Sequence, residues 1–156
     1  MPAVFYLVAA VITAQSAAAL ADFTGRVVRV HDGDTLTVLV DHTQIRVRLT
    51  DIDAPELGQA FGKRSRQSLA DMCAGRVAQV ADRGKDRYRR TLGQVNCGGL
   101  DANTEQVRRG MAWVYVRYAP KNSALYQLES AARARHVGLW AEPAPVPPWE
   151  WRRVKR

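Results

Sequence analysis

The sequence predicts an α+β fold in which five strands close a small OB-type β-barrel, accompanied by about three helices. Two observations support this class: three strand-like segments precede the first helical pattern and two follow it, and helical patterns then fill most of the remaining chain. The chain has 156 residues, of which 47% are hydrophobic. This length and composition favour one domain with a substantial core.

Strands are expected where apolar residues alternate with polar ones, at residues 23–30, 35–40, 44–49, 76–81 and 91–96. Helices are expected at residues 61–72, from Asp101 or Asn103 to 109, and at 123–136. Alternation in the third strand places Arg46 and Arg48 on one face. Pro55 ends the segment that follows.

The N-terminal 21 residues carry no charged side chain and include an apolar run at residues 5–11. Ala19-Leu20-Ala21 fits a secretory cleavage site, which predicts a signal peptide at 1–21 and a secreted or periplasmic mature protein. Because no Lys or Arg precedes the apolar run, an uncleaved membrane anchor is the alternative. We therefore expect a folded domain at residues 22–141 and a Pro/Trp/Arg-rich C-terminal tail at 142–156.

The sequence contains two cysteines, Cys73 and Cys97. In an exported protein such a pair predicts one disulfide, and two buried free thiols are the alternative. The histidines are scattered and no Cys-x-x-Cys motif occurs, which argues against a zinc site.

The chain is strongly basic, with 23 Lys and Arg against 15 Asp and Glu and a net charge of +8. Such a balance suits a polyanionic partner, either nucleic acid or an acidic membrane surface. Charge alone does not decide the matter, because many basic proteins have no such partner.

Acidic and basic residues stand at the ends of the predicted strands. If the strands pair as a meander, Asp34 and Asp53 can meet at a hard cation, because carboxylate oxygens suit Ca²⁺ or Mg²⁺. Arg48 and Arg90 can then bind a phosphate, and Glu56 can serve as a general base or position a water molecule. Taken singly, each residue also fits an ordinary turn, a solvated charge or a strand position. Taken together they predict hydrolysis of a phosphodiester.

Three motifs carry a family resemblance: Asp-Gly-Asp-Thr at 32–35, Val-Arg-Leu-Thr-Asp-Ile-Asp-Ala-Pro-Glu at 47–56 and Asp-Arg-Tyr-Arg-Arg-Thr-Leu-Gly at 86–93. In combination they resemble the staphylococcal nuclease family, and weaker matches continue to residue 140. The resemblance implies an OB-fold nuclease that depends on Ca²⁺, with Mg²⁺ or Mn²⁺ as alternatives. It also implies cleavage of DNA and RNA to 3′-phosphate ends.

The resemblance also implies roles for individual residues. The implied metal ligands are the carboxylates of Asp34 and Asp53 and the main-chain carbonyl of Ala54. The implied catalytic residues are Arg48 and Arg90, which bind the phosphate, and Glu56, the general base. The implied nucleotide contacts are Arg87, Tyr88 and Tyr118.

Three departures from the family pattern bear on these roles. Ala54 stands where the best-known member has Thr, so a hydroxyl is lost. Arg89 stands where Gly is usual, and a positive φ there would strain the backbone and displace Arg90. The segment between Glu56 and the first helix is shorter than in that member.

Two further classes of function compete with the enzyme. A non-catalytic nucleic-acid-binding OB module is the main alternative, and the presence of all five acids and arginines favours the enzyme over it. A basic domain that interacts with a membrane or cell wall is the third. We expect DNA and RNA as substrates, no stable membrane partner, and a monomer.

Overall fold

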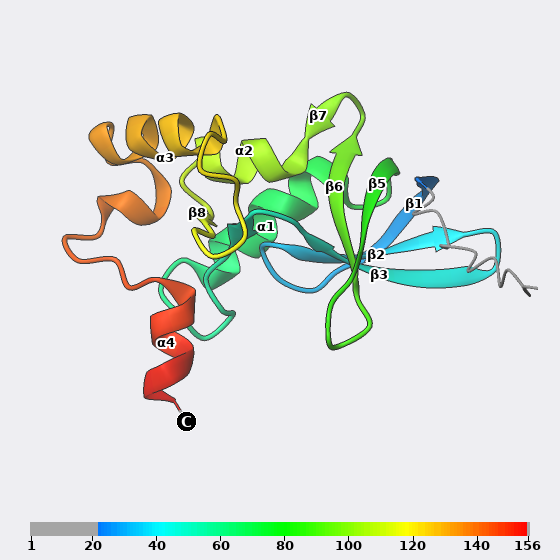
Figure 1. The fold of residues 1–156 in the computed structure, drawn as a ribbon, viewed down its shortest axis with the longest axis horizontal. Coiled ribbons are helices and arrows are strands. Elements are labelled where there is room, and N and C mark those ends of the chain that lie inside the picture. The colour runs from blue at the N-terminus through cyan, green and yellow to red at the C-terminus, as the bar shows by residue number, and fades with distance from the viewer. Residues whose placement is uncertain (1–21, 156) are drawn as a thin grey trace, which may run out of the picture.

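The computed structural model describes residues 22–155, in which five strands close into a barrel and the helices lie mostly on one side of it (Figure 1). The barrel strands are β1 (Phe23–Val30), β2 (Thr35–Val40), β3 (Thr43–Leu49), β5 (Val77–Lys85) and β6 (Thr91–Cys97). They pair in the ring order β1–β2–β3–β6–β5 and back to β1. Every pair is antiparallel except β3–β6, in which Val47 lies opposite Thr91.

Short elements complete the fold. The described residues include three two-residue strands: β4 (Ile52–Asp53) pairs with β8 (Trp113–Val114), and β7 (Leu100–Asp101) pairs with β6. The helices are α1 (Gly62–Cys73), α2 (Ala102–Arg108), α3 (Leu125–Ala134), the 3₁₀ helix η1 (Gly138–Ala141) and α4 (Pro148–Val154). The predicted α+β class with a five-stranded barrel is confirmed.

The elements differ most clearly from the expected ones in β5, in α3 and in the tail. Strand β5 continues past residue 81 to Lys85, because Asp82 and Lys85 still pair with Gly93 and Thr91 across an irregularity in the ladder. Helix α3 ends before His136, whose φ of 51° is incompatible with a continuing helix. The tail forms a fourth α-helix where none was expected. The predicted signal peptide lies outside the described residues.

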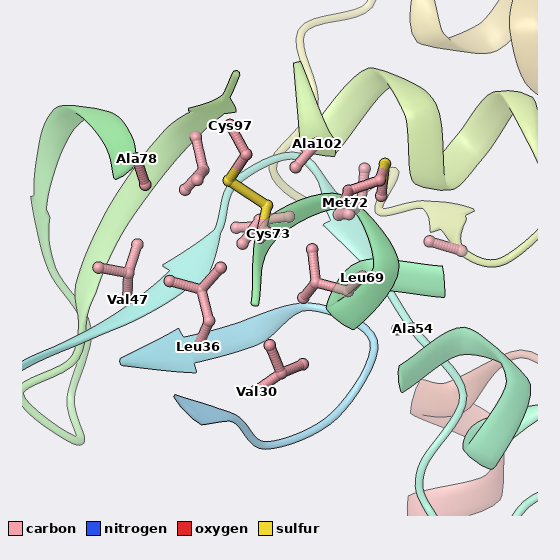
Figure 2. Packing of buried hydrophobic residues seen from close by; sticks show 14 of the residues in the cluster. Val30, Leu36, Val47, Ala54, Leu69, Met72, Cys73, Ala78, Cys97 and Ala102 are labelled. Carbon is pink, nitrogen blue, oxygen red and sulfur yellow. A yellow bond between two sulfur atoms is a disulfide. The ribbon is translucent and has the colours of Figure 1, made fainter. Parts of the chain in front are cut away.

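The core fills the barrel and the space between the barrel and α1 (Figure 2). Val47 and Leu49 of β3 are fully buried in the same hydrophobic cluster as Leu69 of α1, which matches the alternation in the sequence. A disulfide between Cys73 and Cys97 joins the end of α1 to the end of β6, as predicted. Among residues 22–155, no helix has the length and hydropathy needed to cross a bilayer.

Candidate active site

The structure brings Asp34 and Asp53 together at the side chain of Arg48. The Arg48 Nη2 atom lies 2.9 Å from Asp53 Oδ1 and 3.3 Å from Asp34 Oδ2. Both acidic side chains are almost completely buried, with exposed fractions of 8% and 2%. The meander therefore gathers the two predicted carboxylates at one point, and a guanidinium group occupies the place between them.

Asp34 is held by the start of β2 and by the chain after β4. Its Oδ1 accepts a hydrogen bond from the Thr35 hydroxyl at 2.9 Å, and its Oδ2 accepts one from the amide of Ala54 at 2.7 Å. Ala54 is itself buried, and its missing hydroxyl leaves this amide contact intact. These bonds fix the carboxylate in one orientation before any ligand arrives.

The loop before Asp34 is held from the helical side of the molecule. Gln106 of α2 is fully buried, and its Nε2 donates to the Gly33 carbonyl at 2.6 Å and to the Ser65 carbonyl at 3.0 Å. A Cβ atom on Gly33 would lie 1.8 Å from the Ser65 hydroxyl oxygen, so only glycine fits against α1. The position of Asp34 thus depends on packing by residues that the sequence analysis did not single out.

Arg48 is clamped at the end of β3 by the main chain. Its Nη1 donates to the carbonyls of Leu49 and Ile52 at 2.6 and 2.9 Å. Although burial opposes its charge, the carboxylates of Asp34 and Asp53 raise the pKa of Arg48 above its usual value. The guanidinium therefore stays charged and bridges the two acids.

Two acids of the site, Asp32 and Asp53, have perturbed pKa values. Burial, and after it the charge of Asp34, raises the pKa of Asp32 to about 7, while the Asp32 Oδ1 accepts the amide of Asp34 at 3.0 Å. Burial also raises the pKa of Asp53, although Arg152 and Arg48 act in the opposite direction. Such shifts are common where carboxylates are gathered for chemistry.

Glu56 follows β4 on a loop and is 42% exposed. Its carboxylate is joined to Asp53 through a residue that the sequence analysis missed, Arg152 of α4. The Arg152 Nη1 lies 2.7 Å from Glu56 Oε1 and 3.3 Å from Asp53 Oδ1, and its Nη2 lies 2.7 Å from Asp53 Oδ2. Asp53 and Glu56 therefore face the same space.

Among residues 22–155, Arg90 forms no hydrogen bond or ion pair with these acids. Its guanidinium pairs with Asp86 at 2.7 Å, and Thr91 after it lies opposite Val47 of β3. The preceding residue, Arg89, has a φ of 64°, so the left-handed conformation usually given to glycine is present here. The β5–β6 hairpin thus places Arg90 at the β3 edge, engaged with Asp86.

The proposed nucleotide contacts are exposed aromatic and basic side chains. The residues Tyr88 and Tyr118 are 63% and 64% exposed. The guanidinium carbons of Arg87 and Arg90 lie 4.8 and 5.5 Å from the Tyr88 ring centroid, and the Tyr118 ring packs edge-on against Tyr115. No contact joins Tyr118 to the acids among the interactions that the structure describes.

The donor set fits a hard divalent cation. Within residues 22–155, no three His, Cys, Asp or Glu side chains converge as a ready-made metal site, whereas the carboxylates of Asp34 and Asp53 do meet. Their oxygens already attract two cationic groups, from Arg48 and Arg152. Carboxylate oxygens of this kind are what Ca²⁺ and Mg²⁺ bind.

The closed five-stranded barrel, with two carboxylates and two arginines gathered at one place, defines an OB-fold protein of the α+β class. The family described as staphylococcal nuclease homologue matches residues 46–142, and the chain belongs to this family.

Relatives across most of the chain include nucleases. The chain is 48% identical over 158 aligned positions to a micrococcal nuclease of Shigella flexneri, covering 95% of this chain and 91% of that protein. It is 42% identical to an uncharacterized endonuclease of Haemophilus influenzae, covering 94% and 82%. A match to the staphylococcal-like nuclease CAN1 of Arabidopsis thaliana, at 39% identity, covers 72% of this chain and 35% of the plant protein. These findings support a hydrolytic nuclease.

Proposed function

We propose that the protein is an exported, calcium-dependent nuclease that hydrolyses phosphodiester bonds in DNA and RNA and leaves 3′-phosphate ends. The observation that carries the proposal is the convergence of Asp34 and Asp53 at one guanidinium nitrogen, with Glu56 facing the same space. Membership of a nuclease family supports the reaction class.

Asp34, Asp53 and the Ala54 carbonyl would hold Ca²⁺, and Mg²⁺ or Mn²⁺ suits the same oxygens. When bound, the ion supplies Lewis-acid polarisation of the phosphate and offsets its negative charge. With two protein carboxylates as ligands we expect weak binding, at a Kd on the order of 10⁻⁴–10⁻³ M.

The side chains of the protein carry the other roles. Glu56 would accept a proton from the water that attacks phosphorus in line with the departing 5′-oxygen. Arg48 and Arg90 would bind the phosphate and stabilise its added negative charge, which requires Arg90 to exchange Asp86 for the phosphate. The ion pair with Asp86 holds the Arg90 guanidinium in one position before substrate binds, and the exchange would start from that position.

The outer surface supports a polyanionic substrate. Arg87, Tyr88 and Tyr118 would contact nucleotides, since exposed rings stack on bases and exposed guanidinium groups bind phosphates. In the part of the chain that the structure describes, the exposed side chains of Lys63, Arg64 and Arg66 have no acidic partner. Binding is therefore expected to weaken steeply as salt is added.

The proposal extends to location and organisation. The disulfide supports an oxidising compartment, either outside the cell or in a periplasm. Residues 22–141 would form the nuclease domain, residues 142–156 a tail, and the protein would act as a monomer without a stable membrane partner.

The test is cleavage of single-stranded and duplex DNA by the mature chain from Asp22, with Ca²⁺, Mg²⁺ or EDTA. The Glu56→Gln variant is assayed beside it. We expect calcium-dependent cutting, reduced about 10²- to 10⁴-fold in the variant while substrate affinity is largely kept. Salt-sensitive binding without cutting under any metal would contradict the enzyme and support a binding module instead.

A further inference from the structure

The tail of the chain returns to the site through Arg152. This side chain contributes three hydrogen bonds to two acids that lie close to each other in the sequence but about a hundred residues before it. Two of the bonds, to Asp53 Oδ2 and Glu56 Oε1, are 2.7 Å long. Arg152 thereby occupies carboxylate oxygens that the proposed chemistry needs.

The rest of the tail is docked beside the same acids. The Trp149 ring stacks on Tyr115, with centroids 5.5 Å apart and planes inclined by 9°, and it meets Trp113 edge-on. Ahead of the helix, the Val146 carbonyl accepts a hydrogen bond from Gln59 Nε2 at 2.5 Å. Figure 1 shows α4 as a separate helix at the C-terminal end of the ribbon, outside the barrel.

We propose that α4 is a removable plug of the site, in which the Arg152 guanidinium competes with the divalent cation for Asp53 and occupies the carboxylate of Glu56 that would accept a proton from the attacking water. The inference rests on the proposed function, because it takes the cation and the attacking water from it. The occupant of the site in the resting protein is thus a segment of its own chain.

Electrostatics favour displacement once a divalent cation arrives. A doubly charged ion approaches carboxylate oxygens to about 2.3–2.6 Å, closer than the 2.7 Å of the guanidinium bonds and with twice the charge. Arg152 is 39% exposed, so its pair with Asp53 is partly screened by solvent. The guanidinium therefore weakens cation binding without preventing it.

The packing beneath the tail is also compatible with release. A cavity of about 100 Å³ lies between part of the tail and the body, lined by residues that include Pro55, Phe61, Trp113 and Trp151. Helix α4 has seven residues, too few to be stable without its contacts to the body. Loss of the Arg152 contacts is expected to loosen Trp149 as well and so to uncover Tyr115.

Once Arg152 leaves, both functional oxygens become available together. Glu56 keeps its place through its amide, which donates to Gln59 Oε1 at 3.2 Å, and its carboxylate is then free to accept a proton. Asp53 keeps its bond to Arg48. Release of one side chain thus changes the site from an internally neutralised state to one that can bind the cation.

Direct cation binding by the full mature chain tests the proposal. Titration calorimetry with Ca²⁺ alone is compared for the unchanged protein, Arg152→Ala and Arg153→Ala. Arg153 is exposed on the same helix, and its replacement by Ala removes the same charge. The Arg153→Ala variant therefore controls for a general electrostatic effect. We expect Arg152→Ala to bind Ca²⁺ about tenfold more tightly, the scale of one partly exposed ion pair, and Arg153→Ala to match the unchanged protein.

A second measurement follows the helix itself. Hydrogen exchange of the amides in residues 149–154 should become faster when Ca²⁺ saturates the unchanged protein. Arg152→Lys, which keeps the charge but lacks the forked geometry, should give an intermediate Ca²⁺ affinity. Exchange that stays the same or slows on adding Ca²⁺ would overturn the plug, because Arg152 would then remain in the loaded site.

The outcomes separate this proposal from the proposed function. Equal or weaker Ca²⁺ affinity in Arg152→Ala overturns the plug even if the protein cuts DNA. Tighter affinity with no cleavage by any variant supports the competition and contradicts the nuclease. Absence of Ca²⁺ binding to all the variants overturns both.

Discussion

One oxygen of Asp86 accepts a hydrogen bond from Nε of Arg90 at 2.7 Å and forms an ion pair with Nη2 of the same guanidinium, also at 2.7 Å. The other oxygen accepts the amides of Tyr88 and Arg90 at 2.9 Å. The tip of the β5–β6 hairpin is therefore organised around a single carboxylate, which fixes both the turn and the direction of Arg90. Although burial opposes the charge, the bonds from Arg90 lower the pKa of Asp86 below its usual 3.8.

This lowered pKa predicts a pH-dependent contribution to stability. Because the folded protein favours ionised Asp86, the contribution is complete above the unfolded pKa and is lost as the pH falls through the lower folded pKa. We expect Asp86→Asn to reduce the free energy of unfolding by about 1 kcal/mol near pH 6 and by much less near pH 2. Urea unfolding at the two pH values measures the difference in free energy of unfolding between the variant and the unchanged protein. An equal difference at both pH values would contradict the ionic origin.

Arg89 predicts a stabilising substitution, because its φ of 64° is costly for a residue with a Cβ atom. Arg89→Gly should raise the free energy of unfolding by about 1 kcal/mol. Arg87→Gly, two residues earlier where φ is not positive, should lower it through the added freedom of the unfolded chain. Thermal unfolding of both variants compares their stabilities. Destabilisation by Arg89→Gly would show that the contacts of the Arg89 side chain stabilise the fold by more than the backbone strain costs.

The buried hydrogen bonds of Gln106 predict that α2 stabilises the loop that carries Asp34. Gln106→Ala leaves the Gly33 and Ser65 carbonyls without their buried donor and should cost about 2 kcal/mol of stability. It should also weaken Ca²⁺ binding, because the loop that carries Asp34 loses its anchor. Gln67→Ala is the control, since Gln67 is exposed and bonds only to Asp71 on its own helix, so it should change stability by less than about 0.5 kcal/mol. Equal effects of the two substitutions would remove Gln106 from this role.

The disulfide predicts dependence on redox conditions. It closes a loop between positions 24 residues apart and should contribute about 3 kcal/mol by restricting the unfolded chain. Unfolding by urea in the presence of a strong reductant should therefore occur at a clearly lower midpoint. A Cys73→Ala/Cys97→Ala double variant should show the same lower midpoint with and without reductant. An unchanged midpoint on reduction of the natural protein would contradict the expected contribution.

The barrel could be read from the sequence because each of its strands is long enough to show alternation. Val47 and Leu49 point inward and Arg46 and Arg48 share the other face, so a period of two is visible over residues 43–49. The two-residue strands β4 and β8 are too short for any period. Their pairing, which sets Asp53 opposite Trp113, follows from the folded barrel rather than from local sequence.

The site was predictable only where its residues are neighbours in the chain or carry family motifs. Asp34 and Asp53 lie together, but they meet at Arg48, which was expected to bind phosphate, whereas Arg90 is engaged by Asp86 and Arg152 comes from the tail. The helix that carries Arg152 did have a local signal, with Pro148 at its start, Glu150 in the first turn and basic residues in the last. That signal predicts a helix, but no local pattern predicts where on the domain the helix packs.

The parallel pairing of β3 with β6 has a kinetic consequence. These strands are separated by α1 and β5 in the chain. A long loop must therefore close, at a cost in entropy, before the pairing of the two strands stabilises the fold. Arg48 and the hairpin that carries Arg90 therefore come together only when the barrel shuts. A chain that crosses a membrane unfolded would carry no assembled site until it has reached its destination, and recovery of cleavage during refolding would time the final closure of the barrel.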